Sequence, residues 1–153
     1  EVNGRIVYHS SIGRGRGCCI MTRETVTAPY KTLQKETFQI VSIMVDFQLT
    51  VIYLSHEAKG KLQDIQHALT EVLDVQAPQV IVGDFNFDAK ESNCLVSFFK
   101  NIGLSQIVKE VTHTGGRTLD HLYASETMQN RLNLNVQFKY FSDHASLQIK
   151  LKE

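Results

Sequence analysis

The chain has 153 residues, of which 42% are hydrophobic and 21% are charged, a balance typical of one folded domain with its own core. Basic and acidic side chains number 16 each, so the formal net charge of zero excludes an overall positive field as the basis of nucleic-acid binding. Three cysteines are too few for a disulfide framework and favour a reducing compartment, nuclear or cytoplasmic, and no apolar run has membrane length, so no membrane partner is expected.

The first part of the chain is predicted to consist of strands. Two of them are joined by a loop of glycines and arginines, and two more are rich in β-branched and aromatic residues and form a hairpin. The predicted strands are 5–9, 17–22, 37–47 and 49–54.

The clearest helix is predicted at 57–73, because its apolar residues fall on one stripe. Pro78 separates this helix from a short buried strand at 80–82. A second, shorter helix is predicted at 91–100, and Gly103 suits its end. The stripe consists of Leu62, Ile65, Leu69, Val72 and Leu73.

Four further strands are predicted in the last third of the chain. This mixture of strands and helices indicates two packed sheets with helices outside, an α/β sandwich formed by a single domain of residues 1–153. The four ranges are 104–108, 120–124, 132–138 and 146–151.

Two polar residues follow the strand at 80–82 directly. Gly83 lets the backbone leave the strand, and Asp84 and Asn86 are two positions apart, so they can face the same side. A carboxylate can bind a hard cation or take a proton from water, and an amide can donate to a phosphate oxygen. A polar turn after a core strand is an equal alternative for this motif alone.

Two Asp-His pairs occur later, Asp120-His121 and Asp143-His144, each beside a strand-like segment. A carboxylate can hold a histidine in one tautomer, and the histidine can then act on a phosphate or a leaving group. One such pair is weak evidence. The order Gly-Asp-x-Asn, Leu-Asp-His, Ser-Asp-His along one chain is much more specific.

With these motifs the chain resembles the endonuclease/exonuclease/phosphatase family, from residue 13 to 151. That family includes abasic-site endonucleases, LINE-type retrotransposon endonucleases, DNase I-like nucleases and inositol phosphatases. The glycine-rich segment 13–21 looks like the entry to an early strand, and 51–56 looks like the strand that ends in an active-site tyrosine. The run from Thr118 to His144 is most similar to the endonuclease modules of mobile elements.

The resemblance implies a DNase I-like two-sheet sandwich that hydrolyses phosphodiesters with Mg²⁺ or Mn²⁺. DNA is the expected partner, and the protein is expected to be a monomer. Asp84 would orient or deprotonate the attacking water, and Asn86 would bind the phosphoryl oxygen. His144, paired with Asp120, would contact the phosphate, and the Tyr53 hydroxyl would hydrogen-bond to it.

Further roles follow from the same resemblance. Asp143, with help from Asp84, is the expected metal ligand. Thr118, Arg117 and His56 are expected to bind substrate, although the family often has asparagine at the position of His56. His121 would point to the opposite face of its strand, where packing is the expected role.

Two family residues have no match in the sequence. The family carries an asparagine on its first strand and a metal-binding glutamate at the end of its second, and nothing before Gly13 matches either. The chain is therefore interpreted as a fragment lacking the first strands, and weak or no activity is expected of it alone. The alternatives are a non-catalytic remnant that binds nucleic acid or protein, and a phosphatase of the same fold.

Overall fold

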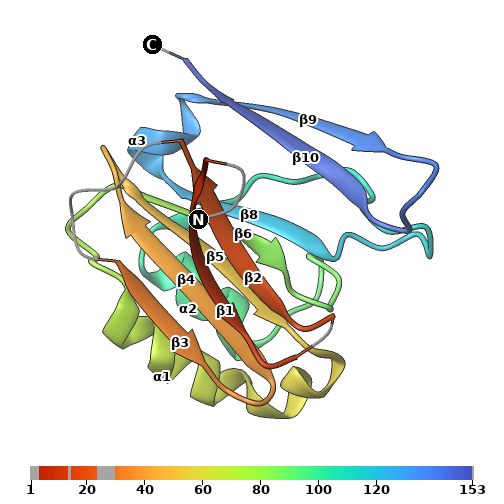
Figure 1. Ribbon diagram of the computed structural model, residues 1–153, viewed down its shortest axis with the longest axis horizontal. Coiled ribbons are helices and arrows are strands. Elements are labelled where there is room, and N and C mark those ends of the chain that lie inside the picture. The colour runs from red at the N-terminus through yellow and green to blue at the C-terminus, as the bar shows by residue number, and fades with distance from the viewer. Residues whose placement is uncertain (1–3, 14, 24–29, 153) are drawn as a thin grey trace.

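A six-stranded sheet forms the centre of the computed structural model, which describes residues 4–13, 15–23 and 30–152 (Figure 1). The strand order is β3-β4-β5-β6-β8-β7, and β5 and β6 are the one parallel pair among these six strands. The strands are β3 (Lys31–Gln34), β4 (Phe38–Met44), β5 (Gln48–Leu54), β6 (Gln79–Asp84), β7 (Leu104–Gln106) and β8 (Asp120–Ser125).

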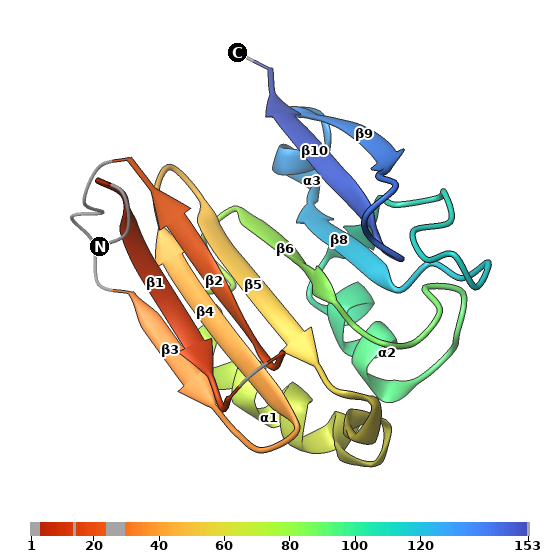
Figure 2. The same ribbon diagram turned by 45° about the vertical axis from the view of Figure 1, so that its right-hand side comes forward.

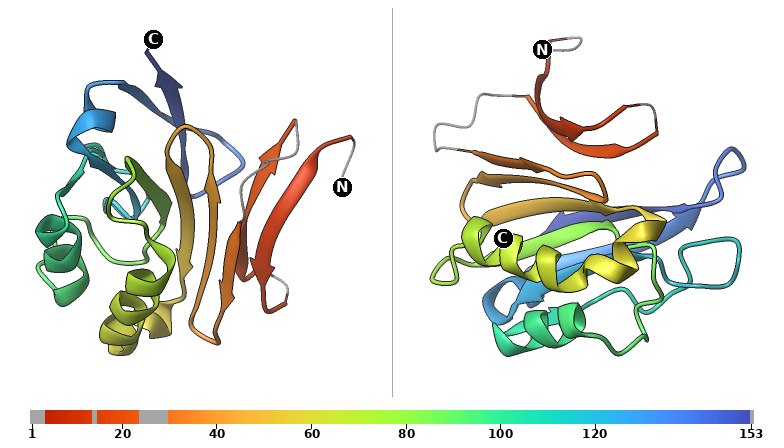
Figure 3. Two further views of the ribbon diagram at one scale, coloured as in Figure 1. Left: turned by 90° about the vertical axis from the view of Figure 1, so that its left-hand side faces the viewer. Right: turned by 90° about the horizontal axis from the view of Figure 1, so that it is seen from below.

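Helices cover one face of this sheet (Figure 3). Ile40, Ile52 and Ile81 point into that face and pack with Ile65 of α1 and Phe99 of α2 in the largest core cluster. The helical segments are the 3-10 helix η1 (His56–Lys61), α1 (Leu62–Val72), α2 (Cys94–Asn101) and α3 (Glu126–Gln129). Within the described residues, no helix is long and apolar enough to cross a membrane.

The helices begin later than predicted, for local reasons. The segment expected to be helical from residue 57 is a 3-10 turn up to Lys61, and α-helix starts only at Leu62. Gly60 lies in that turn, and glycine disfavours the α-helix by about 1 kcal/mol relative to alanine. The second helix starts at Cys94, because the Asn93 side chain caps it by accepting a hydrogen bond from the Val96 N–H at 2.9 Å.

Two hairpins cover the other face of the sheet (Figure 2). The hairpin β1 (Ile6–Ser11) and β2 (Gly17–Thr22) packs on β4, and the hairpin β9 (Leu132–Phe138) and β10 (Ala145–Leu151) packs above β6 and β8. The predicted α/β sandwich of two packed sheets with helices outside is confirmed, and the hairpins form its second sheet layer. The second layer consists of two separate two-stranded sheets among the described residues, with an apolar groove between β2 and β10.

Candidate active site

Three polar side chains lie in one row across neighbouring strands. Tyr53 on β5 is the register partner of Asp84 on β6, and Asp84 is the partner of Asp120 on β8. Residues directly opposite one another in a sheet project from the same face. Val82 and Leu122, two positions along from the two aspartates, pack on the hairpin side, so the row also lies on that side.

Gly83 allows the backbone of β6 to approach the backbone of β5 closely, just before Asp84. A Cβ atom at position 83 would lie 1.8 Å from the Ile52 carbonyl oxygen. Only glycine fits there, so the residue before Asp84 is fixed by close backbone packing.

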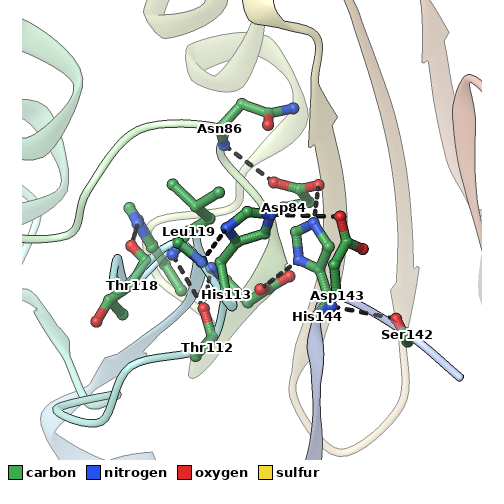
Figure 4. A network of polar contacts seen from close by, with 12 residues as sticks. Asp84, Asn86, Thr112, His113, Thr118, Leu119, Ser142, Asp143 and His144 are labelled. Atoms are coloured by element: carbon green, nitrogen blue, oxygen red, sulfur yellow. Dashed lines mark hydrogen bonds and ion pairs between the residues drawn. The ribbon is translucent and has the colours of Figure 1, made fainter. Parts of the chain in front are cut away.

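His144 reaches the row from the start of the β9–β10 hairpin's second strand (Figure 4). Its Nδ1 lies 2.8 Å from Asp120 Oδ2, and its Nε2 lies 3.8 Å from Asp84 Oδ2. The predicted hydrogen bond between Asp120 and His144 is confirmed. The imidazole therefore lies between two carboxylates, with Nδ1–H donating to Asp120.

Opposing effects act on the pKa values of Asp84 and His144. Burial, followed by the charge of Asp120, raises the pKa of Asp84, although the Asn86 N–H bond and His144 act in the other direction. Burial lowers the pKa of His144, but its hydrogen bond to Asp120 and the negative charges of Asp120, Asp84 and Asp143 outweigh burial and raise that pKa above 6.5. Nearby carboxylates thus favour the imidazolium form of His144.

Tyr53 stands at the other end of the row and is partly exposed. Burial and the charge of Asp84 raise the pKa of its hydroxyl. The hydroxyl therefore stays protonated at neutral pH and is available as a hydrogen-bond donor beside Asp84.

A divalent cation would fit these donors. Ligand atoms of Asp84, Asp120 and His144 all lie within 4.8 Å of one another. Hard cations prefer carboxylate oxygens, and a cation between the two aspartates would offset their mutual repulsion.

A second cluster joins His113, Asp143 and His144. His113 Nε2 lies 3.4 Å from Asp143 Oδ2, and the His113 ring contacts the His144 ring edge-on at a centroid distance of 5.0 Å. His113 Nδ1 accepts a hydrogen bond from the Gly115 N–H at 3.0 Å, so the ring proton of neutral His113 is on Nε2. Because a metal-bound histidine donates through its other nitrogen, this arrangement directs the Nε2 proton of His113 toward Asp143 and disfavours His113 as a metal ligand.

The sequence matches the endonuclease-reverse transcriptase family over residues 47–148, a range that contains the whole row and His144. The chain belongs to this family. It is part of the endonuclease/exonuclease/phosphatase superfamily, as the sequence motifs predicted. No curated protein sequence matches the chain.

Solved structures of the same fold support the assignment. The endonuclease domain of TRAS1, a telomere-specific non-LTR retrotransposon, matches with a TM-score of 0.66 and 16% identity, over 98% of this chain and 79% of that one. An AP endonuclease from Archaeoglobus fulgidus gives 0.68 and 18%, over 97% and 79%. The 3′ phosphatase NExo from Neisseria, bound to a product DNA hairpin, gives 0.67 and 15%, over 98% and 80%.

Asn86 lies next to Asp84 and hydrogen-bonds to it through the backbone (Figure 4). Its φ of 53° turns the chain, and the amide Nδ2 donates to the Leu54 carbonyl at 2.5 Å. The backbone N–H of Asn86 donates to Asp84 Oδ1 at 3.0 Å. The Asn86 amide nitrogen is therefore bonded to the backbone of β5, and phosphoryl binding by the Asn86 amide stays a prediction.

Of the three residues expected to bind substrate, one is buried and two are exposed. Thr118 is only 4% exposed, and its hydroxyl donates to the Glu110 carbonyl, so the structure does not bring it to the row. Arg117 is exposed in the loop that pairs with His113. His56 is exposed after β5, close enough for its charge to lower the pKa of Asp84.

His121 lies in the core, as predicted. Its ring stacks on Phe85 at 4.5 Å, its Nε2 lies 3.0 Å from the Phe87 carbonyl oxygen, and its Nδ1 lies 2.9 Å from the Tyr123 hydroxyl. Burial lowers its pKa, so the ring is neutral. Its contacts with Phe85 and Phe87 hold the segment that follows Asp84 in place.

The sequence did not indicate a role at the site for two residues, Thr112 and His113. The Thr112 hydroxyl oxygen accepts hydrogen bonds from the Leu119 and Asp120 N–H groups, both at 3.0 Å. His113 forms a backbone bridge with His144, 31 positions away. Such pairings have no local sequence signal, since they arise only when the hairpin folds onto the loop.

Proposed function

We propose that this member of the endonuclease-reverse transcriptase family is a metal-dependent phosphodiesterase that cuts DNA, as the endonuclease of a mobile element. The observation that carries the proposal is the row of Asp84 and Asp120, with His144 hydrogen-bonded to Asp120 and 3.8 Å from Asp84. The family match and the fold shared with the TRAS1 endonuclease domain support it.

Each side chain of the row has a chemical task in this proposal. Asp84, whose pKa is raised, accepts a proton from the attacking water as the water oxygen bonds to phosphorus. The P–O bond to the leaving strand oxygen breaks, and that oxygen takes its proton from solvent water. The His144 imidazolium, oriented by Asp120, donates through Nε2–H to a phosphoryl oxygen as negative charge develops. The Tyr53 hydroxyl donates to the same phosphate from the neighbouring strand.

Asp84 and Asp120 would hold the metal ion, whereas Asp143, a ligand expected from the family resemblance, belongs to the second cluster with His113 and His144. Bound Mg²⁺ or Mn²⁺ neutralises charge on the phosphodiester. Since Mg²⁺ prefers six oxygen ligands in near-octahedral geometry, two carboxylates bind it weakly. Weak cleavage by the chain alone is therefore expected.

The experiment is a nicking assay on supercoiled plasmid DNA with Mg²⁺ or Mn²⁺, with EDTA as the metal-free control. Slow, EDTA-sensitive nicking that Asp84→Ala abolishes and Asp46→Ala leaves intact is the expected result; Asp46 lies exposed in the β4–β5 turn. Absence of metal-dependent cleavage would contradict the proposal and favour a non-catalytic binding module.

A phosphatase acting on DNA ends is the second candidate. The structural neighbour NExo is described as a 3′ phosphatase bound to its product DNA hairpin, and its fold is the same. A hairpin with a 3′-phosphate and the same hairpin with an internal phosphodiester distinguish the two activities. Release of inorganic phosphate without nicking would select the phosphatase.

We further propose that residues 1–153 belong to a single domain that is monomeric and acts in the nucleus or cytoplasm. The free thiols of Cys18, Cys19 and Cys94 support a reducing compartment. Sedimentation of the purified protein and imaging of a tagged copy test the two statements.

A further inference from the structure

Two aromatic side chains project into solvent beside the candidate active site. Tyr140 and Phe141 are 101% and 74% exposed, more than any other large apolar side chain in the described residues, where Val75 follows at 61%. The two rings contact each other edge-on at a centroid distance of 5.3 Å. They therefore form a small aromatic knob outside the core clusters.

The local fold does not require aromatic residues at these positions. Tyr140 and Phe141 are the central residues of the turn between β9 and β10, which the Ser142 N–H closes by donating to the Lys139 carbonyl at 3.2 Å. Such positions favour small or polar residues with turn-forming side chains. Two large rings here expose apolar surface without packing gain, which is a mark of a binding surface.

The turn is rigidly connected to the candidate active site. Ser142 Oγ accepts a hydrogen bond from the His144 N–H at 3.1 Å, and the Asp143 carbonyl accepts one from the Thr114 N–H at 2.9 Å. The bridge between His113 and His144 joins the same hairpin to the loop that carries Arg117. The two loops lie side by side at one end of the molecule (Figures 1 and 3).

The charge around the knob suits a polyanion. Lys139 precedes the aromatic pair and is exposed, and Arg117 is exposed on the adjoining loop. Aromatic rings flanked by basic side chains provide base stacking together with phosphate attraction. An exposed acidic side chain, Asp143, follows the turn, but His113 pairs with it.

We propose that Tyr140 and Phe141 stack against bases of the DNA next to the phosphodiester held by the His144 site. This inference rests on the proposed function, which identifies DNA as the binding partner. The knob would position the scissile strand, and Lys139 and Arg117 would contact the phosphates on either side of the stacked base.

The chain contains no tryptophan, so Phe141→Trp introduces a single fluorescent reporter at the knob. Its emission is expected to be quenched when duplex or single-stranded DNA is added in EDTA. Heparin, which has the charge of a polyanion but no bases, is expected to bind without the same quenching. Unchanged emission at saturating DNA, or a response to anionic lipid vesicles and not to DNA, would overturn the proposal.

Affinity measured by fluorescence anisotropy of labelled DNA provides the second test. The double variant Tyr140→Ala/Phe141→Ala is expected to bind about 5- to 150-fold more weakly, the range for loss of one base stack. The exchange Tyr140→Phe/Phe141→Tyr should retain wild-type affinity, and Val75→Ala serves as the matched exposed apolar control. Equal affinity of the double alanine variant and the wild type, or no DNA binding by the wild type, would refute the aromatic contact.

The proposed function is tested separately by hydrolysis of bis(p-nitrophenyl) phosphate, a diester without bases, comparing wild type with Asp84→Ala. Hydrolysis of that ester without any effect of the knob on DNA binding would retain the chemistry and reject the knob. Quenching and weakened DNA affinity without hydrolysis of the ester would retain the knob and reject the chemistry.

Discussion

Asp84 and Asp120 are directly opposite one another on β6 and β8, with the His144 ring hydrogen-bonded to Asp120 and close to Asp84. Like charges opposite one another in a sheet are destabilising. The metal-free protein therefore carries repulsion at this point that a cation or a protonated His144 relieves.

Asp84→Asn should raise the melting temperature of the metal-free protein at pH 7 while it abolishes cleavage. Burial and Asp120 raise the folded-state pKa of Asp84 above 3.8, so the folded protein binds its proton more readily than the unfolded chain. The destabilisation is thus fully present above the folded pKa and disappears as the pH falls to about 3.8. Melting curves of both proteins in EDTA across this range should converge at low pH, and Asp46→Asn should show no such trend.

Asp120→Asn should lower the pKa of His144. Although burial acts against the charged ring, Asp120 supplies the hydrogen bond and the largest charge that raise this pKa. In the wild type, the stabilisation by His144 is fully present below pH 6.5 and is lost as the pH rises through the raised folded-state pKa. An NMR titration of the His144 ring in EDTA measures the change, and an unmoved pKa would show that the carboxylate is not coupled to the ring.

His121→Gln should destabilise the protein by about 1–3 kcal/mol at pH 7, because the Tyr123 hydroxyl and the Phe87 carbonyl lose a partner in the core. The pH dependence is opposite to that of His144. Since burial lowers the folded-state pKa of His121, its stabilising contribution is present above pH 6.5 and is lost as the pH falls toward that lowered pKa. Denaturant unfolding at pH 7 and pH 5 should therefore show a smaller difference between variant and wild type at pH 5.

Gly83→Ala should cost about 3 kcal/mol or more, since the new methyl group would collide with the Ile52 carbonyl oxygen. Gly60→Ala is the matched control, because a Cβ there meets no atom within 4 Å, and it should change stability by less than about 0.5 kcal/mol. Urea unfolding of both variants measures the difference. Equal stability of the two would mean that β5 and β6 separate without cost.

His113→Gln should leave Mn²⁺ affinity within about twofold, whereas Asp84→Asn should remove binding. The Gly115 N–H bond at Nδ1 keeps the His113 proton on Nε2, where a metal would have to bind. Titration with Mn²⁺, followed by the EPR signal of the free ion, reports the affinity. A large loss in the His113 variant would place the metal in the second cluster with Asp143.

Much of the fold could be predicted because its strands have strong local signals. The ranges 17–22 and 132–138 coincide with β2 and β9. β3 was missed because it is four residues long and three of them are exposed, which leaves little apolar pattern. The short α3 was missed as well, since four residues are too few for a helical period.

In the site, the resemblance to the family predicted the Asp120–His144 pair, which the structure contains as a hydrogen bond. The turn at Asn86 could not be predicted, because a positive φ at a residue other than glycine has no clear signal in the sequence. Thr112 and His113 depend on contacts between distant segments, which a linear pattern does not contain.

The row formed by Tyr53, Asp84 and Asp120 has a consequence for how such a protein can change. Strand pairing spaces these side chains, so inserting one residue into β6 before Asp84 would turn the carboxylate to the helix side and destroy the chemistry at once. The loops around the row lie outside this strand pairing, so they tolerate changes in length better than β6 does. Under the proposed function, hydrolysis would depend on the strand ladder and recognition on the loops, so a loop replacement would change the target while the ladder beneath stays the same.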